Sequence, residues 1–412
     1  MEHPITILGA GIIGICTALE LAERGLSVRV IDRGPPGQET SFGNAGVISP
    51  WSIIPQSMPG TIWQIPRMMF GAYKPLAVHW KAWPELVPWG LRLLRQGTEA
   101  RARKNADAMS ILCNPSVDLY RRHLTAAGAE HLLRDSMYVH AFRDGSKASL
   151  DALDVRIRME KGGDLELVGA DSLHRLEPAL SRDFQAAILI KGQGRATSPV
   201  KVCQALSRHA ASLGVTFETG TVQGLERRGS NWAVICDGSE YMAQTVVVAM
   251  GAWSRDLLKT LGVRVPLLGE RGYHVEYSDP QVSTENSVMD TDSKVIASSM
   301  DGGLRVAGQA EFAPLDAPPT QAKFAHMRKL AKGMFPDLNI EGETTWMGRR
   351  PSFPDSLPAL GPIEGHEGLI ANFGHSHYGL MMAPKSAQLV AAHIAGSPHN
   401  EDLTPFRPHR FS

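Results

Sequence analysis

The chain has 412 residues, of which 43% are hydrophobic, and its 42 Lys and Arg residues balance 42 Asp and Glu residues. At roughly 100–200 residues per domain, this length predicts two or three structural units, and the apolar content excludes a disordered chain. The zero net charge argues against a nucleic-acid-binding protein, and no uninterrupted apolar run reaches the length of about 18 residues that predicts a membrane-spanning helix.

The four cysteines are too far apart in the sequence for a CxxC redox motif or a metal knuckle. We interpret them as reduced thiols of a cytoplasmic protein. The short apolar N-terminal run passes directly into a glycine motif, which argues against a cleavable secretory signal. The cysteines are Cys16, Cys113, Cys203 and Cys236.

The first motif joins a short strand, a glycine-rich turn and a helix. A β-branched run at 5–8 leads into a GxGxxG sequence at 9–14, and an apolar helical pattern follows over 15–24. The next apolar run, 28–31, is followed at once by an aspartate, which completes the pattern of a dinucleotide-binding βαβ unit. The residues predicted to hold the dinucleotide here are Gly9, Ala10, Gly11, Ile12, Ile13, Gly14, Asp32 and Arg33.

Each glycine of this motif has its own task. Gly9 permits the tight turn, Gly11 lets the backbone approach a pyrophosphate, and Gly14 allows the helix to pack closely on the strand. The helix N-terminus offers N–H donors to the anion, and Asp32 is expected to accept the ribose hydroxyls. Flavin and nicotinamide dinucleotides share the adenosine diphosphate that this unit binds, so the motif does not distinguish them.

A loop of small and hydroxyl residues over 39–50 favours a flavin. Such a loop permits close main-chain approach, and it supplies N–H and hydroxyl donors to the ribityl chain, phosphates and ring edge of a flavin. An ordinary glycine-rich turn is the alternative interpretation. The flavin contacts predicted in this loop are Thr40, Ser41, Asn44, Ala45, Gly46 and Val47.

A third segment, 245–254, is a buried-type strand that runs into a turn of small residues and returns the chain to the same sheet. The runs 215–218 and 222–225 can add strands, and the backbone at the start of the second run is placed to bond an adenine. The cofactor contacts predicted here are Val222, Ala249, Gly251 and Trp253.

With these segments in place, the sequence resembles the D-amino-acid oxidase superfamily of flavoproteins, most closely the bacterial D-amino-acid dehydrogenases. The resemblance covers nearly the whole chain. It rests on the glycine motif, the loop at 40–46, the segment 249–253, Arg271-Gly272-Tyr273, Arg350-Pro351 with Pro354-Asp355, and Gly374-His375.

The resemblance implies an α/β fold with a Rossmann-like, non-contiguous FAD-binding domain. It also implies an α+β substrate domain with an antiparallel sheet, of the D-amino-acid oxidase and glycine oxidase type. The predicted FAD-binding domain comprises residues 1–50, 192–265 and 345–412. The predicted substrate-binding domain comprises residues 51–191 and 266–344.

The proline-punctuated segment 347–362 carries adjacent arginines and suits rigid positioning. The resemblance assigns binding of a substrate carboxylate to Arg350, because a fixed guanidinium can bind it in a bidentate manner. A structural ion pair is the alternative. On the strand that follows residue 266, Arg271 and Tyr273 share one face and are candidates to help bind the carboxylate, against simple sheet packing. His274 points oppositely and is interpreted as structural.

Near the C-terminus a strand at 369–373 yields to a glycine-bounded loop, and a helix is predicted to start at about Pro384 and to end at Gly396. The positive N-terminal end of this helix would stabilise charge on a reduced flavin. A bare HxH pair lacks the further ligands of a zinc site, so no metal is predicted. The resemblance implies that this loop wraps the flavin ring through Gly374, His375, Ser376, His377, Tyr378, Gly379 and Leu380.

His377 and Tyr378 are bulkier than the family's usual residues in this loop. We therefore expect them to narrow the pocket, with His377 facing the substrate beside Arg350, Arg271 and Tyr273. Phe353 and Ser356 also depart from the threonine and glycine that are common in the dehydrogenases, and this leaves the substrate range open.

The resemblance implies oxidative deamination of a D-amino acid or a secondary amino acid. A hydride passes from Cα to flavin N5, and the imino acid is hydrolysed to a 2-oxo acid and ammonia, with no obligatory side-chain base. Residues 352–356 contain no cysteine, so we expect non-covalent FAD. Electrons would pass to a quinone or another respiratory acceptor. The alternatives are an O₂-using oxidase of the glycine or sarcosine type and a flavin-binding subunit of a larger dehydrogenase complex.

Residues 51–95 hold five of the eight tryptophans, interrupted by prolines that prevent one long helix. The segment is predicted to form short helices. They either contact the inner face of the cell membrane peripherally or cover the pocket as part of the core.

Overall fold

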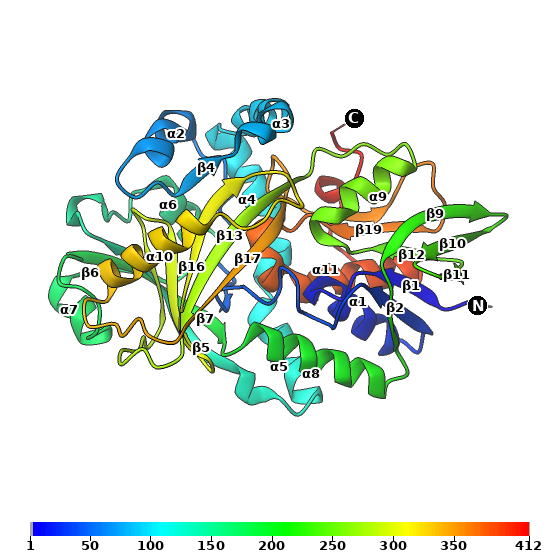
Figure 1. Cartoon of the computed structure of the whole chain (residues 1–412), viewed down its shortest axis with the longest axis horizontal. Helices are drawn as coiled ribbons and strands as arrows, with labels where there is room; N and C mark the ends of the chain where they lie inside the picture. Colours follow the sequence, from blue (N-terminus) through cyan, green and yellow to red (C-terminus); the bar gives the residue numbers. More distant parts are fainter. Residues whose placement is uncertain (1–2, 412) are drawn as a thin grey trace.

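The computed structural model describes residues 3–411, which form two sheet-based units lying side by side (Figure 1). The first unit is built on a six-stranded sheet whose neighbours pair in parallel, except for the antiparallel pair at one edge. In sheet order its strands are β18 (Ala359–Pro362), β19 (Leu369–Phe373), β12 (Val246–Val248), β1 (Ile5–Leu8), β2 (Val28–Asp32) and β8 (Thr216–Thr219).

The centre of this sheet is apolar because β1 and β12 are fully buried, as expected for parallel strands covered on both faces. Helix α1 (Ile12–Ala22) packs against both α11 (Gly379–Ile394) and α8 (Pro199–Ser212). A small antiparallel sheet extends from this unit. Its strands are β9 (Val222–Arg228), β10 (Asn231–Cys236) and β11 (Ser239–Ala243).

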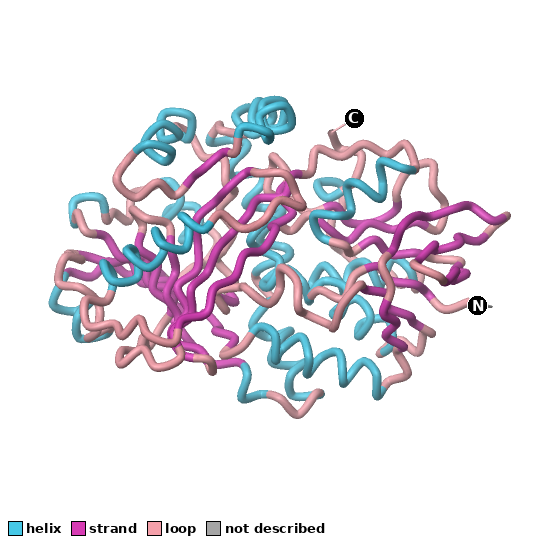
Figure 2. Tube along the Cα trace, viewed as in Figure 1, coloured by secondary structure: helices cyan, strands magenta, loops and turns pink. Residues whose placement is uncertain are grey.

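The second unit is a large, mainly antiparallel sheet, drawn in magenta through the left half of Figure 2. Helix α10 (Gln321–Met334) packs on β13 and contributes to a separate hydrophobic core. In order, the strands are β17 (Glu343–Ser352), β13 (Leu268–Tyr277), β16 (Gly303–Phe312), β15 (Val295–Met300), β14 (Ser287–Asp290), β5 (Leu133–Phe142), β7 (Ala186–Ala196) and β3 (Val47–Ile48), with β4 (Leu76–Val78) beside β16 and β6 (Leu165–Gly169) beside β7.

These two sheets confirm the predicted fold class. The division by residue ranges stays a prediction, and the packing adds two facts to it. Strand β17 pairs with β13 in the large sheet, and helices α4 (Glu99–Cys113) and α5 (Ser116–Ala126) pack against α11 of the first unit. The remaining helices are α2 (Thr61–Phe70), α3 (Trp83–Arg95), α6 (Leu153–Glu160), α7 (Ala170–Leu176) and α9 (Ser254–Thr260).

Helix α11 begins at Gly379, so the predicted start near Pro384 is wrong, and Pro384 lies inside the helix. A proline at this position cannot donate a hydrogen bond to the carbonyl four residues earlier, which belongs to Leu380. The buried Tyr120 hydroxyl donates to that carbonyl at 2.7 Å instead. A tertiary contact therefore allows the helix to start five residues before the proline.

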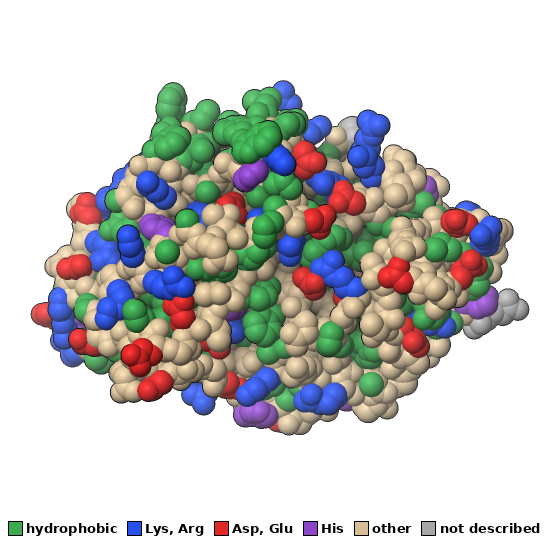
Figure 3. All heavy atoms as spheres, viewed as in Figure 1, with side chains coloured by type: hydrophobic (Ala, Val, Ile, Leu, Met, Phe, Trp, Pro, Cys, Tyr) green, Lys and Arg blue, Asp and Glu red, His purple; other side chains and the backbone are tan. Residues whose placement is uncertain are grey.

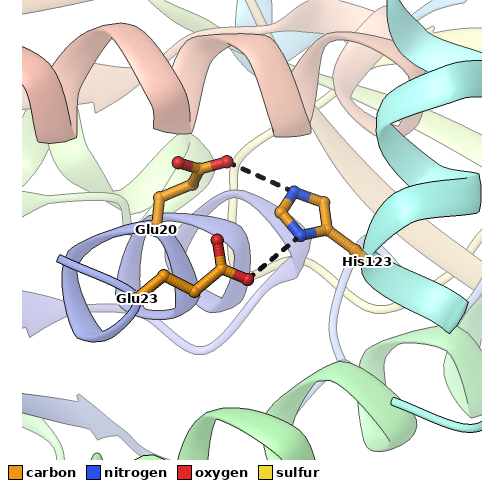
Figure 4. Close-up of side chains that lie close together, drawn as sticks. All are labelled: Glu20, Glu23 and His123. Carbon is orange, nitrogen blue, oxygen red and sulfur yellow. Dashed lines mark ion pairs between the residues drawn. The ribbon is translucent and has the colours of Figure 1, made fainter. Parts of the chain in front are cut away.

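An ion-pair network joins α1 to α5 (Figure 4). Glu20 is buried, and its carboxylate binds Arg24 and Arg122 at 2.5 Å and lies 3.4 Å from His123 Nε2. Glu23 lies 3.7 Å from the other ring nitrogen of His123. The three potential ligand atoms lie within 4.8 Å of one another, but the two arginines already bind Glu20, so we interpret the group as a structural network.

The Glu20 carboxylate is expected to stabilise the fold above its unfolded pKa. Burial raises its pKa, but hydrogen bonds from His123 and Arg24 and the charge of Arg122 outweigh burial and lower it to about 2. Glu20→Gln should therefore lower the free energy of unfolding by about 3 kcal/mol near pH 7, measured by urea denaturation. Because the folded pKa is depressed, the difference should shrink as the pH falls from about 5 towards 2.

The matched control is Glu23→Gln at the C-cap of the same helix, where the side chain is 31% exposed. This variant should lose less than about 1 kcal/mol. Equal losses in the two variants, or a Glu20 effect that does not change between pH 7 and pH 3, would contradict the network.

Candidate active site

The glycine turn is shaped by close backbone approaches. Gly9 has a φ of +106°, and a Cβ there would lie 2.5 Å from the carbonyl oxygen of Ala249. A Cβ at Gly14 would overlap the carbonyl oxygen of Gly9, so only glycine lets α1 start this close to β1. The tight turn at Gly9 and the close packing at Gly14 are thereby confirmed.

The N-terminus of α1 and the end of β2 meet at this turn. Gly11 caps the helix in an extended conformation, and the N–H of Ile12 donates to Ser41 Oγ at 3.0 Å. The Asp32 carboxylate accepts the N–H groups of Ala10 at 2.6 Å and Gly34 at 3.1 Å. An anion-binding helix end thus lies next to a fixed carboxylate, which is the donor and acceptor set that a pyrophosphate and a ribose need.

A cavity of about 1450 Å³ runs from this turn to the large sheet. Most of the residues predicted to bind the cofactor or the substrate line it. These are Gly9, Gly11, Ile12, Ile13, Asp32, Arg33, Thr40, Ser41, Asn44, Ala45, Val47, Val222, Ala249, Gly251, Trp253, Tyr273, Arg350, Gly374, His375, Ser376, His377, Tyr378, Gly379 and Leu380.

Four of the predicted residues do not line the cavity. Ala10 and Gly14 support the turn from behind through the contacts described above. Gly46 has a φ of +79° and donates its N–H to Asn44 Oδ1, so it shapes the loop. Arg271 is turned away from the cavity, as its contacts show below.

Arg350 lies directly over Gly272, because a Cβ on that glycine would overlap the guanidinium. Its Nη1 donates to Glu270 Oε1 at 2.8 Å and to the carbonyl of Gln309 at 2.9 Å. Nε and Nη2 have no hydrogen-bond partner among residues 3–411. One side of the guanidinium is therefore fixed by protein, and two donors remain for a ligand in the cavity.

The buried Glu270 completes this arrangement. Its second carboxylate oxygen accepts from Gln56 Nε2 at 3.0 Å and from Ser352 Oγ at 3.3 Å. Burial raises the pKa of Glu270, but the charge of Arg350 and the hydrogen bonds from Arg350 and Gln56 outweigh burial and bring the pKa below its ordinary value. The carboxylate is ionised at neutral pH and acts as the counterion that holds Arg350.

The loop that ends at α11 contributes two uncharged imidazoles. His377 lines the cavity, and its Nδ1 lies 3.3 Å from Gln56 Nε2. Burial lowers its pKa to about 4 and that of His375 to about 3. His375 Nε2 lies 3.0 Å from Ser386 Oγ. The first turn of α11 follows directly, so its N-terminal end lines the cavity.

Arg271 and Tyr273 share a face of β13, as predicted, but it is the face opposite Arg350, so their placement beside Arg350 is wrong. Side chains alternate along a strand, and Glu270 is the residue that pairs directly with Arg350. The Arg271 guanidinium donates to three carbonyl groups of the loop 314–318. The Tyr273 hydroxyl donates to Glu311 and its ring packs on Phe324 of α10. Both side chains therefore hold the large sheet to the segments packed on it, the loop 314–318 and helix α10.

Several residues of the site were missed by sequence reasoning. Glu270 holds Arg350, and Gln56 contacts His377. The alternation of side chains along β13 could have indicated Glu270 if the face that carries Arg350 had been known. Trp346 packs over Gly43 and Gly348, where a Cβ would overlap the indole ring, and it stacks on His274 with centroids 5.3 Å apart. Gln309 has a φ of +60°, a strained conformation that is frequent at functional sites.

Ser356 occupies a position where the sequence departs from the family's usual glycine. Its φ of +67° lies in the left-handed region that favours glycine. Its hydroxyl accepts the N–H of Gln56 at 2.9 Å. The serine thereby ties the backbone of Gln56 to the proline-rich segment behind Arg350.

Helices α2 and α3 lie at the top of the molecule in Figure 1. Their apolar side chains line part of the cavity. Trp89 is buried, and its indole N–H donates to the carbonyl of Ser352 at 3.1 Å. Trp63, Trp80 and Phe70 are instead 83%, 70% and 77% exposed. The segment 51–95 thus covers the cavity, as one of its two interpretations predicted, and also carries an apolar outer surface.

Taken together, a Rossmann-like unit, a glycine cradle for a dinucleotide and a guanidinium at the far end of one cavity define a dinucleotide-dependent enzyme site. The family model for FAD dependent oxidoreductases, named DAO, matches residues 4–393. The chain belongs to the DAO family of FAD-dependent oxidoreductases, and FAD is its cofactor, as predicted.

Similar proteins cover almost the full chain. It is 34% identical to a D-amino-acid oxidase of Bradyrhizobium diazoefficiens, over 99% of this chain and 98% of that protein. It is 31% identical to a D-amino acid dehydrogenase of Rhizobium johnstonii, over 95% and 96%. The crystal structure of glycine oxidase from Geobacillus kaustophilus has the same fold, with a TM-score of 0.75 at 21% identity over 99% and 98% of the two chains.

Proposed function

We propose that this protein oxidises D-amino acids by oxidative deamination. The observation that carries the proposal is Arg350, which faces the FAD cavity with two free guanidinium donors while Glu270 and Gln309 fix the third nitrogen. A guanidinium held in this way binds a carboxylate in a bidentate manner. The names of the relatives that cover nearly the full chain support an amino acid as the owner of that carboxylate.

FAD, when bound, supplies the acceptor at N5 for the hydride that leaves the substrate Cα. The protein orients the substrate through Arg350 and closes the site with the loop that carries His377 and Tyr378. The Tyr378 hydroxyl donates to the carbonyl of Ile54, which fixes this loop to the cavity wall. The N-terminal end of α11 adds partial positive charge at the cavity.

No side chain of the site is assigned as a general base. Glu270 is occupied by Arg350, Gln56 and Ser352. His377 is neutral at pH 7, and its low pKa makes it a weak proton acceptor. The substrate amine is therefore expected to react in its neutral form, and the product imine is released for hydrolysis to a 2-oxo acid and ammonia. Non-covalent FAD is supported by the absence of cysteine from residues 352–356.

The test is anaerobic reduction of the purified FAD-loaded protein, which is monitored as a loss of flavin absorbance. D-amino acids should bleach the flavin without any partner protein, whereas the L-enantiomers, glycine and N-methylglycine should bleach it slowly or not at all. Bleaching only by glycine or N-methylglycine would favour an oxidase of the glycine or sarcosine type. No bleaching by any of these compounds would refute the proposal.

We further propose that electrons leave to a quinone or another respiratory acceptor at a membrane surface. The observation that favours this is an apolar surface over α2 and α3, which appears as the green cluster at the top of Figure 3. No helix among residues 3–411 is long and apolar enough to span a membrane. We call the apolar surface over α2 and α3 the α2–α3 surface. Its exposed members are Ile62, Trp63, Phe70, Trp80, Trp83, Val87 and Leu91.

Removal of two aromatic side chains should weaken membrane contact. Trp63→Ser with Phe70→Ser is expected to lower vesicle binding by about 10-fold or more, since each buried aromatic side chain contributes about 1.5–3 kcal/mol. Cosedimentation with lipid vesicles measures this. Leu213→Ser, which removes a 44% exposed apolar side chain after α8, is the control and should change nothing. Wild-type protein that stays in the supernatant while oxygen supports rapid turnover would contradict the membrane proposal.

A further inference from the structure

A second group of polar and charged residues lines the cavity, and the reaction described above does not use it. It lies on β5, on α6 and at the turn between β14 and β15. Its members are His140, Asp154, Arg158 and Lys294.

Lys294 is the cation of this group that lacks an ion pair. Its ammonium group has no hydrogen bond and no carboxylate within 4.0 Å among residues 3–411. The surrounding protein lowers the pKa of its ammonium group, while Asp154, Asp292 and Asp290 act in the opposite direction. Its side chain is accessible and lines the cavity, so the cavity is where an anionic partner can reach it.

The three aspartates near Lys294 are already engaged. Asp154 accepts from Arg158 Nη1 at 2.8 Å. Asp290 accepts from Arg143 at 3.2 Å and from the N–H groups of residues 292 and 293. Asp292 lies 3.7 Å from both Arg67 and Lys147. Each of these carboxylates has another partner, and none of them pairs directly with the Lys294 ammonium group.

The backbone presents Lys294 in a strained conformation. Its φ is +57°, unusual for a residue other than glycine, and its N–H donates to the carbonyl of Asp290 at 2.9 Å to close the turn. A Cβ at Gly308 would overlap the Lys294 carbonyl, so the turn fits tightly against β16. Such strain at a cavity wall is typical of functional positions.

Two other polar side chains of this group also have a nitrogen without a hydrogen-bond partner. Arg158 is buried, and its Nε and Nη1 bind Trp51 and Asp154, whereas Nη2 has no partner among residues 3–411. His140 is 6% exposed, and its Nε2 is buried with no hydrogen-bond partner in the described part of the chain. His140 lies within the electrostatic reach of both Arg158 and Lys294.

This second group lies close to Arg350 through a short chain of contacts. Arg350 donates to the carbonyl of Gln309, and Gln309 Nε2 donates to the carbonyl of Ser293 at 3.0 Å, the residue before Lys294. Strands β15 and β16 pair directly, and neighbouring strands are about 4.8 Å apart. The turn that carries Lys294 is therefore linked to Arg350 through one residue, Gln309.

We propose that Lys294, assisted by Arg158, binds a carboxylate on the substrate side chain, so that the preferred substrates are acidic D-amino acids. This inference rests on the proposed function and specifies its substrate class. Arg350 holds the carboxylate next to Cα, and Lys294 holds the carboxylate of the side chain, as in D-aspartate and D-glutamate.

The first test compares D-glutamate with D-glutamine and D-alanine in anaerobic reduction of the FAD-loaded protein. At limiting substrate concentration, D-glutamate should reduce the flavin of the wild-type protein at least about 10-fold faster than D-glutamine or D-alanine does. This is the difference expected for one charged hydrogen bond. Lys294→Gln should lower the D-glutamate rate by about 10- to 100-fold and change the D-glutamine rate by less than about 3-fold. Lys191→Gln, which removes a lysine paired with Glu166 outside the cavity, should leave both rates unchanged.

The second test measures binding without turnover, by calorimetry of the same FAD-loaded variants with glutarate and butyrate. These probes differ by one carboxylate. The wild-type protein should bind glutarate about 10-fold more tightly than butyrate, whereas Lys294→Gln should bind the two compounds equally. Preference for D-glutamine or D-alanine, or an equal loss of all rates in Lys294→Gln, overturns the inference while the proposed function stands. If no D-amino acid reduces the flavin, the proposed function fails as well.

Discussion

Arg350→Leu is expected to lower kcat/KM for the D-amino acid substrate by about 10- to 150-fold, because a charged hydrogen bond to the substrate carboxylate contributes about 1.5–3 kcal/mol. The guanidinium faces the cavity with Nε and Nη2 available. Its loss should raise KM more than it lowers kcat if the carboxylate is bound equally in the ground and transition states. Stopped-flow flavin reduction across substrate concentrations separates the two parameters.

The same substitution leaves Glu270 without its counterion. Loss of one partner of a buried ion pair typically costs about 3–5 kcal/mol, so Arg350→Leu should also lower the melting temperature. The pair Arg350→Leu with Glu270→Leu should recover much of that stability without recovering activity. Arg349→Leu removes the neighbouring guanidinium on the opposite face, where it donates to Leu315, and should keep kcat/KM within about 3-fold. Unchanged kinetics in Arg350→Leu would remove it from the site.

Gly14→Ala is expected to lower the free energy of unfolding by about 3 kcal/mol or more and to weaken FAD binding by about 100-fold. The added Cβ would overlap the backbone carbonyl of Gly9, and a backbone atom cannot move aside as a flexible side chain can. Helix α1 must therefore shift on the sheet, and its N-terminal N–H groups shift with it. Urea denaturation and flavin fluorescence titration measure the two effects.

Gly11→Ala provides the matched control for that substitution. A Cβ at Gly11 would lie 3.4 Å from Ser41 Oγ, an ordinary contact, so the FAD-free protein should unfold like wild type. FAD binding should nevertheless weaken, because this residue faces the cavity where the pyrophosphate is expected. If Gly14→Ala is as stable as Gly11→Ala without FAD, the close packing of α1 on β1 does not limit the fold.

The dinucleotide end of the site could be predicted from sequence because its signals are local. Turn, helix start and strand end lie within residues 9–32, and glycine spacing reports their backbone geometry directly. The same holds for β19, which the structure places at Leu369–Phe373 as the pattern indicated. The resemblance to a known family then supplied the second sheet and the role of Arg350.

The substrate end could not be predicted to the same depth because it depends on which face of a strand meets the cavity. Arg271 and Glu270 are adjacent in sequence, and only the pairing with Arg350 decides between them. The start of α11 depends in the same way on a contact from Tyr120, 264 positions earlier than Pro384 in the chain. The role proposed for Lys294 has no sequence signal, because it depends on the pairing of the nearby aspartates with other cations.

The order in which the central sheet is completed has a consequence for biosynthesis. Strand β12 lies between β1, at the beginning of the chain, and β19, which follows residue 368. A nascent polypeptide that still lacks β19 and the loop after it exposes an apolar edge and half of a coenzyme pocket. We therefore expect FAD to bind only to nearly finished chains, and we expect polypeptides truncated before residue 369 to be bound by chaperones and degraded by proteases.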